Sequence, residues 1–270
     1  MKSKKCTILG LGWLGLPVAN HLIEKGFKVN GTTTSIEKSE RINSTTKIEA
    51  FVWNLEHSPS EDLIAKTSKS NVVIVAIPAS KVFKNLDNLI LFLSALPQKI
   101  ELVFCSSTGV YPDDLVTSSE TYQFTEKDFS NSNVQMEVRL QKELQQRLTI
   151  LRLAGLIGAN RHPVTMLSGR ENIPDGDAPV NLVQLKDVVL FIDALFEKKF
   201  FGEIVNVCYP IHPTRSEYYT SCAEHLGIPV PHFLEGTTKL KIVSSEKSIV
   251  ELGFHYLHTI TLHPINSALN

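Results

Sequence analysis

Three glycines near the start of the chain have the spacing of a phosphate-binding loop. Gly10, Gly12 and Gly15 form a G-x-G-x-x-G pattern after an apolar run and before a helical pattern. In such loops the first glycine permits a tight turn, the second lets a pyrophosphate approach, and the third lets helix and strand pack closely. The helix start adds a partial positive charge. The pattern predicts dinucleotide binding through Gly10, Gly12, Trp13, Leu14 and Gly15; the alternative is a purely structural turn.

The residues after the second apolar run bear on the choice of dinucleotide. In an NAD-selective site an acidic residue there accepts hydrogen bonds from the ribose 2′-OH. This chain instead has the hydroxyl residues Thr33, Thr34 and Ser35, followed by Lys38, with no carboxylate before Glu37. Charge-assisted hydrogen bonds from lysine suit a 2′-phosphate. We therefore expect NADP, with NAD as the less favoured cofactor; the alternative is a polar loop that only caps the next helix.

Repeated strand and helix units are expected to position these residues. Short apolar runs alternate with longer amphipathic stretches, which is typical of a parallel sheet. The expected strands cover residues 5–9, 27–31, 48–53, 71–77, 99–105 and 149–153, and the expected helices cover 13–25, 36–43, 61–68, 81–96 and 134–147. The run at 71–77 lacks polar alternation, so helices should cover both its faces. The predicted fold class is α/β, with a Rossmann-type doubly wound parallel sheet.

The pattern changes after residue 154. Seven glycine and proline residues crowd into positions 155–179, and one long helical pattern at 186–199 precedes an apolar run at 203–207. Such a density of turn formers predicts loops and short elements. We therefore expect a dinucleotide-binding core at 1–154 and a mixed segment at 155–270. That segment should return one helix and one strand to the core and form a small C-terminal substrate-binding lobe.

Four ordered segments resemble the extended short-chain dehydrogenases/reductases, the family of nucleotide-sugar epimerases and dehydratases. Residues 103–112, VFCSSTGVYP, are similar to the family's SS-x-x-VYG strand end, and three later motifs resemble residues 151–158, 180–188 and 205–207. Within the family the chain most resembles the atypical branch typified by bacterial YeeZ-type proteins. The resemblance implies a dinucleotide under the first lobe and a small polar substrate, often a nucleotide-linked sugar, under the second.

The same resemblance extends the expected cofactor site. The third strand ends at Asn54 and Leu55, where the family usually has an Asp-Leu pair that touches adenine. Asn54 offers both a hydrogen-bond donor and an acceptor. The fourth strand ends at Ile77 and Pro78, which should pass beside the adenosine ribose.

Catalysis in active family members uses a serine or threonine and a tyrosine whose pKa is lowered by a lysine four residues later. Ser107 matches the serine, but none of the six tyrosines has a lysine four positions on. Aligning the family's helix by Glu143 puts Gln135 and Arg139 at the tyrosine and lysine positions. Glutamine has no titratable proton. Arg139 would still hold the nicotinamide ribose.

Other side chains are candidates for the missing acid or base and for substrate contacts. Arginine suits bidentate recognition of phosphate or carboxylate, although loop anchoring is the alternative for each. The candidate acids or bases, which lie in motif loops near the expected carboxyl edge of the sheet, are Tyr111, Glu120 and His162. The candidate substrate contacts are Thr108, Arg161, Asn181 and Arg215.

Three functional hypotheses follow. The favoured one is an NAD(P)-dependent epimerase- or dehydratase-like enzyme, with a displaced acid/base or with chemistry that needs no tyrosine. The second is a non-catalytic NADP-binding sensor or scaffold. The third is a 3-hydroxyacid-dehydrogenase-like oxidoreductase, because residues 10–22 resemble the opening of that group. That group has an all-helical second domain, which the Gly/Pro-rich region and the run at 203–207 oppose.

Composition argues against several other classes. The 270 residues include 27 Lys+Arg and 28 Asp+Glu, so a net charge of −1 supplies no general attraction to nucleic acid or anionic membranes. No run approaches the ~18 apolar residues of a membrane span. Four widely spaced cysteines fit reduced thiols, which are typical of a cytoplasmic protein. For the oligomeric state we expect a monomer or a homodimer. No cysteine lies near His255, His258 and His263, so we expect no metal.

Overall fold

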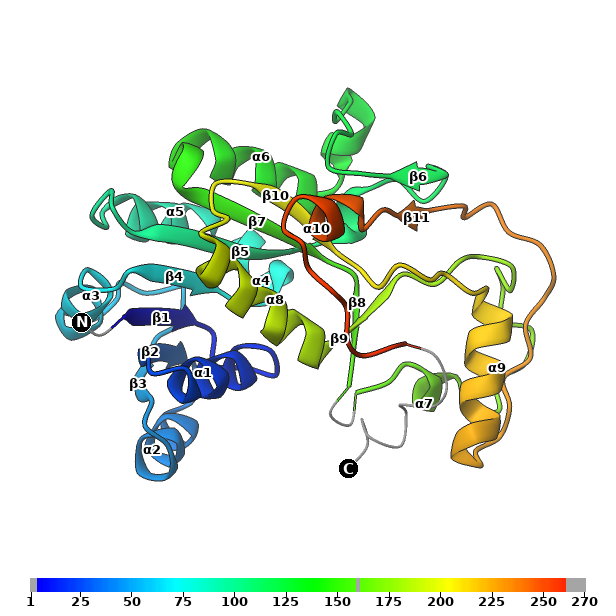
Figure 1. The fold of residues 1–270 in the computed structure, drawn as a ribbon, viewed down its shortest axis with the longest axis horizontal. Coiled ribbons are helices and arrows are strands. Elements are labelled where there is room, and N and C mark those ends of the chain that lie inside the picture. Colours follow the sequence, from blue (N-terminus) through cyan, green and yellow to red (C-terminus); the bar gives the residue numbers. More distant parts are fainter. Residues whose placement is uncertain (1–3, 159–160, 261–270) are drawn as a thin grey trace. The chain divides into compact units, whose positions relative to one another are not determined.

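The computed structural model describes residues 4–158 and 161–260, and these contain one seven-stranded sheet (Figure 1). Its strand order is β10-β7-β5-β4-β1-β2-β3. In chain order the strands are β1 (Lys5–Leu9), β2 (Lys28–Thr33), β3 (Glu49–Val52), β4 (Val72–Val75), β5 (Glu101–Ser107), β7 (Leu148–Leu153) and β10 (Ile204–Val207). The chain runs from β1 outward to β3, returns to β4 and continues the other way. This doubly wound order confirms the predicted Rossmann-type fold.

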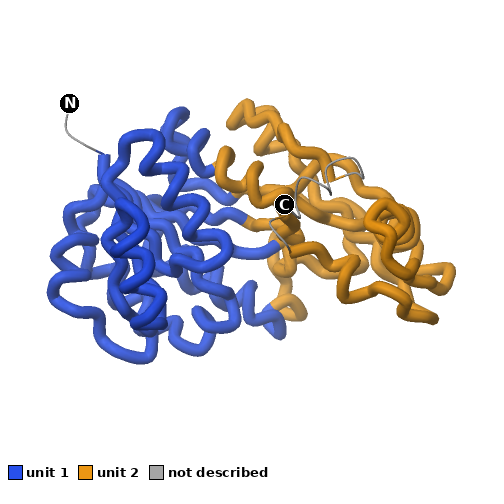
Figure 2. The backbone as a smooth tube through the Cα atoms, turned by 90° about the horizontal axis from the view of Figure 1, so that it is seen from below, with its two compact units in different colours: residues 1–107, 129–151, 192–204 blue, residues 108–128, 152–191, 205–270 orange. Residues whose placement is uncertain are grey.

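The chain forms two compact units that interleave along the sequence (Figure 2). Unit 1 comprises residues 1–107, 129–151 and 192–204, and unit 2 comprises 108–128, 152–191 and 205–270. The single boundary expected after residue 154 is therefore replaced by several crossings. The helical pattern at 186–199 forms α8 (Leu185–Lys198), and the apolar run at 203–207 forms β10, the edge strand of the seven-stranded sheet.

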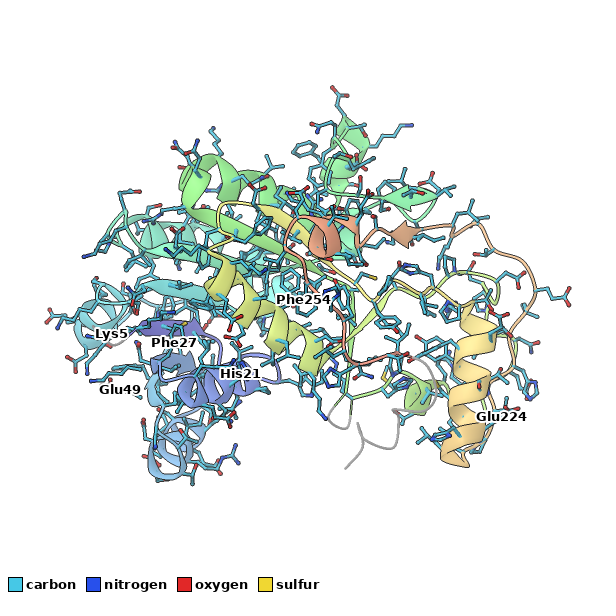
Figure 3. The ribbon with its side chains drawn as sticks, in the orientation of Figure 1. Lys5, His21, Phe27, Glu49, Glu224 and Phe254 are labelled. Carbon is cyan, nitrogen blue, oxygen red and sulfur yellow. The ribbon has the colours of Figure 1, made fainter. Side chains whose placement is uncertain are left out.

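Helices cover both faces of the strands in unit 1. One face packs against α3 (Glu61–Thr67), α4 (Ala79–Lys84), α5 (Leu86–Ser94) and α6 (Ser132–Leu144) through a continuous apolar cluster. On α1 (Gly15–Glu24), His21 Nε2 lies 3.1 Å from an Asp193 carboxylate oxygen of α8 (Leu185–Lys198). Phe27, which Figure 3 labels together with His21, packs edge-on against Phe196, also of α8, with ring centroids 5.0 Å apart. α2 (Ile36–Thr45) follows β2 and packs against β2 and β3.

Two expected helices have different limits in the structure. The helix expected at 81–96 is two helices, α4 and α5, because Asn85 leaves helical geometry and its Nδ2 donates to the Lys81 carbonyl at 3.2 Å. The helix expected at 134–147 starts at Ser132 after the Asn131 cap and stops at Leu144, since Gln145 has φ 52°. The remaining unit 1 elements lie within a few residues of their expected positions.

Unit 2 contains short elements around its own apolar core. Parallel pairs join β8 (Gly155–Ile157) to β9 (Leu182–Gln184) and β6 (Thr117–Ser118) to β11 (Ile242–Val243). Its helices include α7 (Val164–Leu167), α9 (Arg215–Leu226) and α10 (Glu246–Val250). These strands disagree with the all-helical second domain of the 3-hydroxyacid dehydrogenase alternative.

Candidate functional site

The glycine loop has the geometry that its pattern predicts. Gly10 has φ +99°, a conformation that side chains disfavour. A Cβ on Gly15 would lie 2.1 Å from the Gly10 carbonyl oxygen, so only glycine allows this close approach of α1 to the loop. A Cβ on Gly12 would meet no atom within 4 Å, so the space next to Gly12 is open. The loop thus leaves room for a ligand directly before the start of α1.

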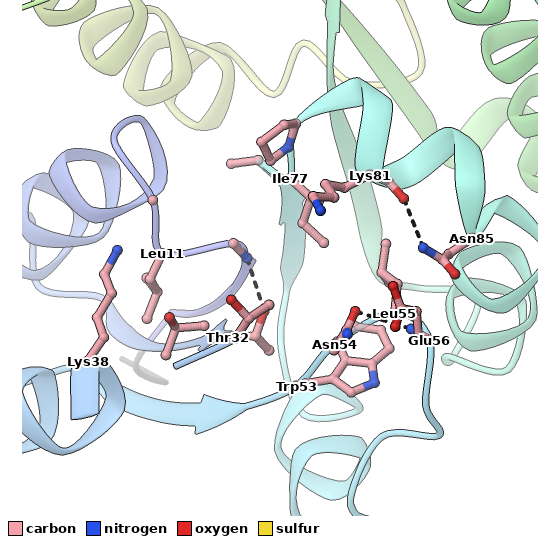
Figure 4. A pocket seen from close by; sticks show the side chains of 16 residues that line it. Leu11, Thr32, Lys38, Trp53, Asn54, Leu55, Glu56, Ile77, Lys81 and Asn85 are labelled. Carbon is pink, nitrogen blue, oxygen red and sulfur yellow. Dashed lines mark hydrogen bonds between the residues drawn. The ribbon is translucent and has the colours of Figure 1, made fainter. Parts of the chain in front are cut away.

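A cavity of about 390 Å³ lies beside this loop, entirely within unit 1 (Figure 4). It combines apolar side chains with hydroxyl, amide and ammonium groups. Of the residues predicted from the sequence to hold the cofactor, it brings together Gly10, Gly12, Thr33, Thr34, Lys38, Asn54, Leu55, Ile77 and Pro78. These come from the ends of β1, β2, β3 and β4 and from α2, so the cavity follows the carboxyl edge of the sheet.

Other residues expected to hold the cofactor do not line this cavity. Trp13 and Leu14 lie between the loop and α1, and Gly15 opens α1. The Ser35 hydroxyl accepts the Lys38 backbone N–H at 3.1 Å and caps α2. For Ser35 the structure therefore favours the capping role that was the alternative to phosphate binding.

The cavity also includes residues that the sequence reasoning did not select. Lys81 and Glu56 add one charge of each sign, and Leu11, Thr32, Trp53, Ala76 and Asn85 complete the lining. Lys81 could have been found, because it stands in the first helical turn after β4 and strand ends share one edge. Asn85 lines the cavity because α4 ends there, which the helical periodicity did not reveal.

The buried face of α6 carries Glu137 and not Glu143, the residue on which the family's helix was aligned. Glu143 is exposed, whereas the Glu137 carboxylate is fully buried and accepts the Ser106 hydroxyl of β5 at 2.5 Å. Arg139 lies on another side of α6, where it forms an ion pair with Asp87 of α5. Arg139 is therefore not among the residues that line the cavity beside the glycine loop.

Gln135 lines the same cavity as Arg139. Its Nε2 donates to the Phe129 carbonyl at 2.7 Å, and Gln135, Arg139 and Asp87 line a second cavity, which shares only Asn85 with the first. The helix position one turn before Glu137 on the same face is Asn133. Ser107 ends β5 next to Ser106 and is half-buried.

Tyr111 and Glu120 belong to a buried network in unit 2. Tyr111 is 2% exposed; its hydroxyl donates to Asn206 Oδ1 at 2.9 Å and accepts from the Arg152 guanidinium at 2.8 Å. Burial raises the pKa of Tyr111. The Glu120 carboxylate accepts the Asn206 backbone N–H at 2.7 Å. These contacts hold segments of unit 2 together and oppose a role for Tyr111 in proton transfer near neutral pH.

His162 is a core residue of unit 2. It is 6% exposed, and its Nδ1 accepts the Val164 N–H at 3.2 Å. The ring proton therefore sits on Nε2, which donates to the Tyr218 hydroxyl at 2.9 Å. Burial lowers the pKa of His162 to about 4. The imidazole is neutral, hydrogen-bonded through both ring nitrogens and enclosed in an aromatic cluster. This contradicts the expectation of an accessible acid or base.

Two of the four candidate substrate contacts anchor loops instead. Asn181 donates to the Lys241 carbonyl and accepts the Val243 N–H, both at 2.8 Å. The Arg215 guanidinium donates to the Pro174 carbonyl at 2.7 Å and lies 5.3 Å from the Phe233 ring centroid. For Arg215 this is the loop-anchoring alternative, and the Asn181 contacts likewise anchor one loop to another.

The remaining two candidates sit at turns. Thr108 is buried where the chain leaves β5, and its carbonyl accepts the Tyr111 N–H at 3.2 Å. Arg161 is exposed, and its backbone pairs with Gly158.

Residues 4–158 and 161–260 contain no group of three His, Cys, Asp or Glu side chains able to hold a metal ion. His258 Nδ1 lies 2.7 Å from the buried Asp187 carboxylate, and His263 lies outside the described residues. Within the same ranges no helix is long and apolar enough to cross a membrane.

No protein-family model matches the chain. Protein YeeZ from Escherichia coli (strain K12) is 34% identical, over 94% of this chain and 96% of that protein. UDP-glucuronic acid 4-epimerase from Bacillus cereus, solved with NAD, has a TM-score of 0.76 at 14% identity, covering 95% and 93% of the two chains. dTDP-glucose 4,6-dehydratase from Bacillus anthracis str. Ames, also solved with NAD, has a TM-score of 0.71 at 16% identity, covering 95% and 93%. The chain therefore belongs to the YeeZ family and has the Rossmann-type fold of NAD-dependent epimerases and dehydratases.

Proposed function

We propose that this protein is an NADP-dependent, epimerase- or dehydratase-like cytoplasmic enzyme that acts on a nucleotide-linked sugar or a similarly small polar substrate. The observation that carries the proposal is the cavity beside the glycine loop in unit 1, which Lys38 of α2 lines and in which the end of β2 contributes threonines and no carboxylate. The B. cereus and B. anthracis structures, which hold NAD in the same fold, support the dinucleotide.

The residues around the cavity fit this cofactor chemically. The pyrophosphate would lie at the glycine loop and the start of α1, where backbone N–H groups and the helix dipole favour anions. Thr33, Thr34 and Lys38 would hold a ribose 2′-phosphate, because hydroxyl and ammonium donors suit its oxygens. Leu55 and Ile77 offer apolar surface to the purine. The bound cofactor would supply hydride transfer.

Ser107 is the residue we assign to the reacting hydroxyl of the substrate. It ends β5, one residue after Ser106, whose hydroxyl is fixed by the buried Glu137 carboxylate. A serine hydroxyl held in place can donate to or accept from a substrate oxygen without changing its own charge. Asn133, on the same face of α6 as Glu137, carries no titratable proton, so Ser107 would orient the substrate rather than remove its proton.

One observation favours a second function, a non-catalytic NADP-binding sensor or scaffold. All three candidate replacements for the missing tyrosine are engaged in contacts within unit 2: Tyr111 with Asn206, Glu120 with the Asn206 backbone, and His162 with Tyr218. Without a proton carrier, ordinary alcohol oxidation would be slow.

Two measurements test these proposals in sequence. Titration of the whole protein with NADPH and with NADH, followed by calorimetry and by the fluorescence of Trp53 in the cavity, should show tighter binding of NADPH. Equal or tighter binding of NADH would contradict the NADP assignment. Turnover over a panel of nucleotide sugars, lost in Ser107→Ala with the NADPH affinity retained, would support the enzyme. Tight NADPH binding without any turnover would favour the sensor.

A further inference from the structure

We infer that Thr32 is a positioning residue for the cofactor, which presets the shape of the glycine loop and also offers its hydroxyl hydrogen to the bound pyrophosphate. The inference rests on the proposed dinucleotide function. Thr32 lies near the end of β2, is 2% exposed and lines the cofactor cavity (Figure 4).

Thr32 contacts the loop through both its side chain and its backbone. Its Oγ1 accepts the Gly10 N–H at 3.0 Å, and its carbonyl accepts the Leu11 N–H at 2.6 Å. The Gly12 N–H in turn bonds to the Gly10 carbonyl at 2.8 Å. Three successive loop N–H groups therefore bond within the protein, so the loop is shaped before a ligand arrives. Phosphate oxygens must then take later N–H groups, at the start of α1.

Gly31 makes this contact possible. A Cβ at residue 31 would lie 2.6 Å from the Ile8 carbonyl oxygen and 2.9 Å from the Leu11 side chain. Because a real Cβ does not approach other atoms so closely, a larger residue would push Leu11, and the loop with it, away from β2. The Gly-Thr order in β2 thus supplies first the space for the loop and then its hydrogen-bond acceptors.

The Thr32 hydroxyl has a second capacity that the protein does not use. A hydroxyl carries one donor hydrogen and two acceptor lone pairs. Gly10 occupies one lone pair, and among the residues at 4–158 and 161–260 no acceptor contacts the hydrogen. A donor hydrogen at the wall of a cavity is satisfied only by water or by a ligand that accepts from it. An anionic phosphate oxygen beside the glycine loop would do so.

Thr32→Val tests the inference, because valine keeps the shape of threonine and removes both hydrogen bonds of the hydroxyl. We expect the Kd values for NADPH and NADH to rise by the same factor, about tenfold, since the pyrophosphate is common to both. Thr32→Ser keeps the hydroxyl and should stay within about twofold of wild type. A substitution that removes only a contact with the 2′-phosphate would instead raise the Kd for NADPH and leave that for NADH unchanged.

Thr7→Val is the matched control. Thr7 is a fully buried, hydrogen-bonded threonine on the neighbouring strand β1 and does not line the cavity. It should lower stability without changing either Kd. Unchanged affinities in Thr32→Val, or equal losses in Thr7→Val and Thr32→Val, would overturn the inference.

Hydrogen exchange gives a readout that needs neither substitution nor ligand. The Gly10 and Leu11 amides of the free wild-type protein should exchange slowly, because both bond to Thr32. Fast exchange at both would overturn the inference even if Thr32→Val failed to fold. A wild-type protein that binds neither dinucleotide but protects these amides would contradict the proposed function and the hydroxyl's role toward the ligand, while leaving the shaping of the loop intact.

Discussion

In unit 1 several polar groups selected from the sequence line a cavity, whereas in unit 2 most of the selected groups bond to other groups of the protein. Thr33, Thr34 and Lys38 line the cofactor cavity, while Tyr111 and His162 are buried with protein partners on their polar atoms. Both sets have chemically suitable side chains. The difference lies in whether the fold supplies another partner, because a buried polar atom needs one in the absence of a ligand.

The largest expected effect tests the assignment of His162 to the core. Burial lowers its pKa to about 4, below its ordinary 6.5. The unfolded chain therefore takes up a proton first as the pH falls, and folding free energy is lost between about pH 6.5 and pH 4. The loss should approach about 3 kcal/mol. Urea unfolding of wild type and His162→Gln across this range should show a flatter profile for the variant.

His232→Gln is the control for that measurement, because the His232 side chain is 64% exposed. It should keep the wild-type pH profile. Identical slopes in wild type and His162→Gln would show that another group causes the loss.

The next effect concerns Lys38 in unit 1. Lys38→Ala should raise the Kd for NADPH about tenfold, because a charge-assisted contact to the 2′-phosphate is removed. The Kd for NADH should not change, since NADH has no such phosphate. Calorimetric titration measures both. Lys84→Ala, on α4 and outside the cavity, should leave both affinities at their wild-type values. Equal loss for the two cofactors would remove Lys38 from the 2′-phosphate site.

A smaller effect is expected for Ser35, which caps α2, whereas its neighbours Thr33 and Thr34 line the cavity. Ser35→Ala removes the hydroxyl that caps α2 and should lower the free energy of unfolding by about 1 kcal/mol. The NADPH affinity should remain, because Ser35 does not line the cavity. Ser35→Asp, which restores a cap, should recover the stability. A loss of NADPH affinity in Ser35→Ala without loss of stability would show that Ser35 contacts the cofactor, as expected from the sequence.

The smallest effect is expected at Arg139. Its ion pair with Asp87 is exposed on both sides, and such pairs contribute little. Arg139→Ala should therefore change the free energy of unfolding by less than about 0.5 kcal/mol. The NADPH Kd should stay at the wild-type value. A marked rise in that Kd would mean that Arg139 leaves Asp87 to hold the cofactor.

The glycine loop and the strand and helix pattern of unit 1 were predictable because their causes are local. Gly10 needs its positive φ, and β4 is apolar on both faces, whatever the rest of the chain does. The face of α6 was misassigned because it was set by a motif alignment on Glu143, whereas the apolar residues Val134 and Leu140, three positions to either side, place Glu137 on the buried face. The partner of Glu137 on β5, Ser106, is distant in sequence and does not follow from this pattern.

Long-range partners also explain the errors in unit 2. The sequence could not pair Tyr111 with Asn206, His162 with Tyr218 or Asn181 with Lys241, since each pair is separated by more than fifty residues. Motif position indicated a loop near the sheet edge, and the partners then determined what each side chain does. Backbone-directed motifs therefore transferred to the structure better than side-chain roles did.

The interleaving of the two units has a consequence for the order of events during synthesis. Unit 1 takes its last part from residues 192–204, so a ribosome must complete about three quarters of the chain before that unit has all its strands and helices. By then residues 108–128 and 152–191, which belong to unit 2, have already emerged. Neither unit can be expressed as a continuous fragment, and a stop codon shortly after residue 151 would release the central sheet without its edge strand β10.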